Sequence, residues 1–118
     1  MKSNFQIKRV YEEPAASDGF RILIDRLWPR GLSKEVAKVD LWLRDIAPST
    51  DLRKWFNHDP AKWDQFQKLY RAEILENKEA FAILKQKIKE EKMTTLVYAA
   101  KDEAHNDAVV LRLLLSEK

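Results

Sequence analysis

The sequence FRILIDRLWPRG, residues 20–31, indicates the fold class. Residues 22–24 are apolar on both faces of an extended chain, as in a strand that is covered on both sides. We therefore predict a central strand from Phe20 to Trp28, which Pro29 and Gly31 end. Such a strand is typical of a parallel sheet in an α/β domain.

Strand and helix patterns alternate on both sides of this central strand. A first strand is predicted over residues 5–11 and a compact last strand over residues 94–100, whereas residues 39–47 fit either a short strand or a short helix. Helices are predicted after Ser33, after Ser49 or Thr50, after Asp59-Pro60, over residues 78–91 and over residues 108–115. This order predicts a small Rossmann-like, three-layer α/β domain, with a mainly parallel sheet and helices on both faces.

The composition is that of one globular domain. The chain has 118 residues, of which 45% are hydrophobic, so we expect a single domain over residues 1–118. There is no cysteine, which excludes disulfides, thiolate nucleophiles and zinc sites built on sulfur. Residues 1–9 lack the apolar segment of a secretory signal, and no apolar run approaches the ~20 residues of a membrane span. We expect a cytoplasmic protein that does not enter a membrane.

Charge and glycine content exclude several function classes. The net charge is +3, from 22 basic and 19 acidic residues, and there is no basic tail, so nucleic acid is only weakly supported as a partner. With two glycines the chain has no P-loop and no glycine-rich dinucleotide motif. No metal-site spacing is present, so no metal is predicted. The sequence indicates neither a cofactor nor an oligomeric state.

Candidate functional residues follow the predicted strands. Ligands of open parallel sheets bind at the carboxyl ends of the strands, because loops and helix N-termini meet there. Three residues in these positions have the chemistry to transfer a proton: Asp25, Asp45 and His105. Others could bind an anion or stack on a ring, and we place in this ligand-binding group Arg26, Trp28, Arg30, Lys34, Ser49, Tyr98, Lys101 and Asp102.

Structural roles are the alternatives at these positions. Asp25 could form an ion pair with a neighbouring arginine that locks the loop, with Trp28 covering the sheet edge. Ser49 has the position of a helix cap, which is the commoner role of serine there. His105 could equally be a histidine of a capping turn.

The same stretches carry a family resemblance. Arg9-Val10-Tyr11, DRLWPRGLS (25–33), WLRDIAPS (42–49) and YAAKDEAHN (98–106) resemble the YeaO-like branch of the domain-of-unknown-function 488 family over nearly the whole chain. The resemblance implies a compact Rossmann-like α/β domain and no established activity. Many members of the broader family carry a cysteine and a glutamate on the last strand and then a Cys-His-Arg string. Those positions here are Tyr98, Ala100, Asn106, Asp107 and Ala108, so thiol chemistry does not transfer.

Two functions are consistent with these residues. In the first, the protein is an enzyme or sensor for a small anionic ligand, nucleotide-like or phosphorylated, bound at the carboxyl ends of the strands. In the second, it is a non-catalytic binding module that uses its arginine and tryptophan surface for nucleic acid or a protein partner. The convergence of candidate residues at the strand ends favours the first.

Overall fold

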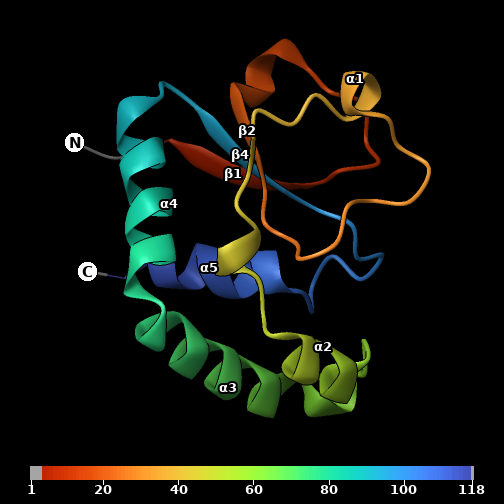
Figure 1. The fold of residues 1–118 in the computed structure, drawn as a ribbon, viewed down its shortest axis with the longest axis vertical. Coiled ribbons are helices and arrows are strands. Elements are labelled where there is room, and N and C mark those ends of the chain that lie inside the picture. The colour runs from red at the N-terminus through yellow and green to blue at the C-terminus, as the bar shows by residue number, and fades with distance from the viewer. Residues whose placement is uncertain (1–3, 118) are drawn as a thin grey trace.

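The central feature of the fold is one wholly parallel sheet. Figure 1 shows the computed structural model, which describes residues 4–117. The strands run in the order β1-β4-β2-β3, so the chain is an α/β protein with a parallel sheet, as predicted. They are β1 (Phe5–Arg9), β2 (Phe20–Leu23), β3 (Leu41–Trp42) and β4 (Thr94–Tyr98). β4 lies between β1 and β2 and is buried along its whole length.

Helices α1 and α2 begin directly after the capping serines that the sequence indicates. In the described part of the chain they are α1 (Lys34–Ala37), α2 (Thr50–Phe56), α3 (Trp63–Glu76), α4 (Lys78–Glu90) and α5 (Asp107–Ser116). Ser33 and Ser49 cap α1 and α2 by accepting backbone N–H bonds, and Asp59 caps a 3₁₀ turn, Pro60–Lys62, that leads into α3. None of these helices is both long and apolar enough to cross a lipid bilayer.

The two faces of the sheet are covered unequally. Ile22 and Leu96 belong to the larger apolar core, which is completed by side chains of α2, α3, α4 and α5. Leu23 and Val97 point the other way, into a smaller core. Among the described helices only α1 contributes to it, through Ala37, and the rest comes from Trp42 of β3 and apolar side chains of nearby loops. Figure 1 shows α4 and α5 on one side of the strands and α1 on the other. One face therefore has a full helical layer and the other a thin cover.

The predicted strands are longer than the observed ones: β1 ends at Arg9 and not at residue 11, and β4 ends at Tyr98 and not at residue 100. The strand predicted from Phe20 to Trp28 is too long, because regular pairing stops where Leu23 meets Trp42, the last residue of β3. The segment 39–47 contains the two-residue strand β3 and then a 3₁₀ turn, Arg44–Ile46, so neither a longer strand nor an α-helix forms. The loop that carries Asp25 thus begins at the carboxyl end of β2, next to the buried strand β4.

The order of the strands creates a crevice between β2 and β4. The connection after β2 leads to α1, which packs on the smaller core, whereas the connection after β4 leads to α5, which packs on the larger core. Neighbouring parallel strands whose connections leave on opposite faces open a crevice at their carboxyl ends. Any ligand site that follows this rule lies beside Asp25 and the loop from Ala99 to Asn106.

Candidate functional site

A cavity of about 680 Å³ occupies this crevice. Its walls come from the loop after β2, the loop between β4 and α5, and the end of α2, and they are mainly apolar. A volume of this size is within the range of small-molecule sites. Seven of the sequence-predicted residues line it: Asp25, Arg26, Trp28, Arg30, Lys101, Asp102 and His105.

Asp25 is held by backbone groups and by another acid. Its Oδ2 accepts a 2.8 Å hydrogen bond from the N–H of Ala99, just beyond β4. Its carbonyl oxygen accepts the indole N–H of Trp42 at 2.7 Å. Within residues 4–117 Asp25 forms no salt bridge, so the alternative of an Asp25–arginine pair is not what the structure contains. Arg26 and Arg30, the arginines of this loop, are therefore not neutralised by Asp25.

The acid beside Asp25 is Asp107, the first residue of α5. Both carboxyls line the cavity, and Asp107 Oδ1 accepts a 3.0 Å bond from the N–H of Ala108. Burial raises the pKa of both carboxyls, and the nearby charge of Asp25 adds to the increase at Asp107, which lies well above the ordinary range. Hydrogen bonds from Asp107 and Ala99 partly oppose the increase at Asp25. Two carboxyls that interact in this way titrate as a pair and not independently.

Asp102 and His105 form a second pair at the rim of the cavity. Asp102 Oδ2 lies 2.9 Å from Nδ1 of His105, and Asp102 Oδ1 accepts the backbone N–H groups of Ala104 and His105. The hydrogen bond from His105 lowers the pKa of Asp102. The ring of His105 also packs edge-on against Trp63, with centroids 5.2 Å apart. The turn therefore fixes His105 in one orientation with an acidic partner on one ring nitrogen.

Basic side chains surround the cavity without acidic partners. Arg26 donates from Nε to the carbonyl oxygen of Pro48 at 3.1 Å and from Nη2 to that of Ala47 at 3.3 Å. Arg30, Arg53 and Lys101 are exposed and form no salt bridge within residues 4–117. Their charges are available to a ligand.

His58 and Arg53 also line the cavity, although sequence reasoning did not assign them a site role. Both come from α2 and the turn after it. Asn57 and His58 have φ values of 45° and 55°, a left-handed conformation that is uncommon outside glycine. These two consecutive residues end α2 and turn the chain so that the imidazole of His58 lies along the cavity.

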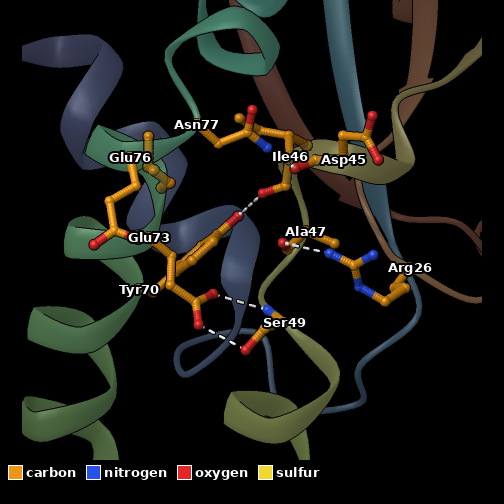
Figure 2. A pocket seen from close by; sticks show the side chains of 10 residues that line it. Arg26, Asp45, Ile46, Ala47, Ser49, Tyr70, Glu73, Glu76 and Asn77 are labelled. Atoms are coloured by element: carbon orange, nitrogen blue, oxygen red, sulfur yellow. Dashed lines mark hydrogen bonds between the residues drawn. The ribbon is translucent and has the colours of Figure 1, made fainter.

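A smaller cavity of about 320 Å³ contains Asp45, Ser49 and the far side of Arg26, and Figure 2 shows its polar groups. Ser49 donates its hydroxyl to Glu73 at 2.6 Å and its N–H to the same carboxylate at 2.8 Å. The hydroxyl of Tyr70 donates to the carbonyl of Ile46 at 2.6 Å. These polar groups satisfy each other's hydrogen-bonding capacity. They therefore form a structural junction between α2, α3 and the 3₁₀ turn.

Two predicted ligand-binding residues line neither cavity. Tyr98 is 2% exposed and belongs to the larger core, and burial raises its pKa. Lys34 is exposed as the first residue of α1, on the side of the smaller core. Within residues 4–117 no group of three or more His, Asp or Glu residues is arranged to hold a metal ion.

Comparisons with known proteins place the chain in a family. Residues 4–118 match the family model described as the inactive DUF488-N3 subclade. The chain belongs to the DUF488 family. This DUF488 chain is 42% identical to the uncharacterized protein YeaO of Escherichia coli strain K12 over 108 residues, which cover 92% of the chain and 93% of that protein. It is 37% identical over 115 residues to the uncharacterized proteins Mb3100c of Mycobacterium bovis and Rv3073c of Mycobacterium tuberculosis H37Rv, covering 98% of the chain and 96% of each relative.

No solved structure matches this DUF488 chain. The expected membership is thus confirmed by the family model and by the relatives, while the relatives themselves are uncharacterized.

Proposed function

We propose that this chain is a single-domain cytoplasmic protein, of Rossmann-like three-layer type, that binds a small anionic ligand in the larger cavity. The ligand is nucleotide-like or phosphorylated. The observation that carries the proposal is the cavity between β2 and β4, with Arg30, Arg53 and Lys101 around it and no acidic partner for them among residues 4–117. Unpaired guanidinium groups bind phosphate and carboxylate through two parallel hydrogen bonds.

Binding fits the site better than turnover. The proton-transfer candidates Asp25 and His105 are each engaged by another acid, Asp107 or Asp102, and the family model describes its subclade as inactive. A sensor or carrier protein needs only to bind its ligand and does not need to catalyse a reaction. We therefore assign the site a binding role, with Asp25 and His105 as contact residues.

A thermal-shift titration tests the proposal. Inorganic phosphate, ribose 5-phosphate and adenosine 5′-monophosphate are added to the wild type and to Arg30→Ala/Arg53→Ala. A ligand at 100 times its Kd stabilises the wild type by about 2.7 kcal/mol, which raises Tm by several degrees. The double variant loses most of this increase because its bidentate contacts are gone.

The matched control is Lys34→Ala, which removes an exposed cation that lines neither cavity. It keeps the ligand-induced shift. An equal shift in all three proteins, or none in the wild type with any probe, contradicts the proposal. A partner that is nucleic acid would instead show binding to oligonucleotides that weakens steeply with salt.

A further inference from the structure

The imidazole of His105 is held from two sides at the rim of the larger cavity. Asp102 Oδ2 lies 2.9 Å from Nδ1, and the ring packs edge-on against Trp63 with centroids 5.2 Å apart. Asp102 is itself fixed, because its Oδ1 accepts the backbone N–H groups of Ala104 and His105. The ring cannot turn without losing one of these contacts, so its orientation is a fixed feature of the rim.

The bond to Asp102 sets the tautomer of the imidazole. Hydrogen bonds, above all the one from His105, lower the pKa of Asp102, so this carboxyl is ionised near neutrality and only accepts hydrogen bonds. The proton of a neutral imidazole is then on Nδ1, which leaves the lone pair on Nε2. Within residues 4–117 Nε2 has no hydrogen-bond partner, and 34% of the side-chain surface of His105 is accessible.

His105 lies in the same cavity as the unpaired cations Arg30, Arg53 and Lys101. A histidine whose Nδ1–H is held by a carboxylate is activated at Nε2 as a base or a nucleophile. Cations around it neutralise the charge on a phosphoryl group during transfer. A capping turn accounts for Oδ1 of Asp102 but not for Oδ2, which binds the ring. The arrangement therefore combines a nucleophile with a phosphate site.

We propose that Nε2 of His105 accepts a phosphoryl group from a small acyl phosphate bound in the larger cavity. The lone pair of Nε2 forms a P–N bond, the P–O bond to the acyl group breaks, and the acyl group leaves as a carboxylate with that electron pair. No general acid is needed, because a carboxylate leaves without a proton. Nδ1 keeps its proton, and Asp102 stabilises the positively charged ring. Each chain is modified once. This step goes beyond the proposed function and rests on it for the binding of the phosphate.

The two histidines of the chain, His58 and His105, provide an internal control. Both line the cavity, but His58 has no acidic partner within residues 4–117. The protein is incubated with acetyl phosphate at about pH 8, at which free imidazole is neutral. We expect one phosphoryl group, about 80 Da by intact mass, that is lost in acid. Peptide mapping at alkaline pH places it on His105 and not on His58, phosphorus NMR assigns it to Nε2, and His105→Gln abolishes it.

Asp102→Asn tests the positioning role of the carboxylate. The amide oxygen still accepts the N–H groups of Ala104 and His105, but its NH₂ group donates to Nδ1 and moves the ring proton to Nε2. The nucleophilic lone pair is then lost from Nε2, so we expect the rate of phosphorylation to fall by about tenfold or more. Nitrogen NMR of the imidazole shows the change of tautomer, which a purely structural role would not produce. Circular dichroism and Tm show that the variant is folded.

The outcomes distinguish this inference from the proposed function. If inorganic phosphate binds through Arg30 and Arg53 and no acid-labile adduct forms, the cavity is an anion site and phosphorylation is overturned. Equal modification of both histidines also overturns it, because the reaction is then that of any exposed imidazole. If His105 is modified equally fast in Arg30→Ala/Arg53→Ala, phosphorylation stands and the proposed phosphate contacts are wrong. If no phosphate binds and no adduct forms, both proposals fail.

Discussion

At the residue scale, Tyr70 connects the helical layer to the loop before α2. Its side chain is completely buried, and its hydroxyl donates a 2.6 Å hydrogen bond to the carbonyl oxygen of Ile46. Tyr70→Phe leaves that buried carbonyl without its partner. We expect the free energy of unfolding to fall by about 1–3 kcal/mol in urea denaturation.

The matched substitution is Tyr11→Phe. The hydroxyl of Tyr11 also donates to a carbonyl oxygen, that of Arg30, but at an exposed position where water replaces the bond. Its effect on stability stays within about 0.5 kcal/mol. If both variants lost the same free energy of unfolding, burial of the Tyr70 hydrogen bond would not add to its contribution to stability.

The residues that the sequence alone could not place are Asp107 and His58. An aspartate after Asn106 has the pattern of an ordinary helix start, and Asn106 does cap α5. That Asp107 meets Asp25 depends on β4 lying next to β2, which no local pattern specifies. That Asp25, Arg26 and Trp28 line the cavity was predictable because they come directly after the apolar residues 22–24.

At the element scale, β2 and β4 start very close together. Gly19 precedes β2 with a φ of 64°, and a Cβ atom there would overlap the carbonyl oxygen of Met93, which accepts the N–H of Phe20. Gly19→Ala has to push the two strands apart. We expect it to lower the free energy of unfolding by more than about 2 kcal/mol in denaturant titration, since strain and overlap add.

Gly31→Ala is the control for backbone strain alone. Gly31 also has a positive φ, 79°, but a Cβ there meets no atom within 4 Å. Its cost is about 1 kcal/mol. If the two alanine variants were equally unstable, close approach of β2 and Met93 would not explain Gly19.

Helices were easier to predict than strand lengths. Side-chain caps and Pro60 mark helix starts locally, so Ser33, Ser49 and Asp59 are readable in the sequence. Strand length depends on partners, and β2 pairs with β4 over four residues but with β3 over only two. The unequal cover of the two faces depends on where the long connection through α2, α3 and α4 packs, which is a tertiary property.

At the scale of the whole molecule, carboxyls with opposite pKa shifts lie near opposite ends of β2. Asp18, at the amino end, is 1% exposed. Burial alone would raise its pKa, but hydrogen bonds from the N–H of Ala15 and the side chains of Lys8 and Arg21 outweigh burial and lower it. Asp25 and Asp107, near the carboxyl end, have raised pKa values.

The contribution of these three carboxyls to the free energy of unfolding should therefore be largest near pH 3.8, their unfolded value. The stabilisation from Asp18 is present above pH 3.8, the unfolded value, and is lost as the pH falls through the lowered pKa. The contribution of the carboxyl pair is complete below pH 3.8 and is lost as the pH rises through the raised pKa values. Urea denaturation across the pH range measures both limbs.

Single substitutions assign the two limbs. Asp107→Asn flattens the fall toward alkaline pH, because the amide has no proton to lose. Asp18→Asn flattens the acid limb and costs about 3 kcal/mol at neutral pH, since Arg21, 3% exposed, loses its ionic partner. A wild-type profile that rises steadily from pH 5 to pH 9 would contradict the assignment of the pair.

The tryptophans around the cavity give the molecule a built-in optical signal. Trp28 lines the cavity, Trp42 donates its indole N–H to Asp25, and Trp63 lies edge-on to His105. Indole emission changes with the polarity around the ring and with the charge of an adjacent imidazole. We therefore expect the intrinsic fluorescence of the unlabelled protein to report occupancy of the cavity.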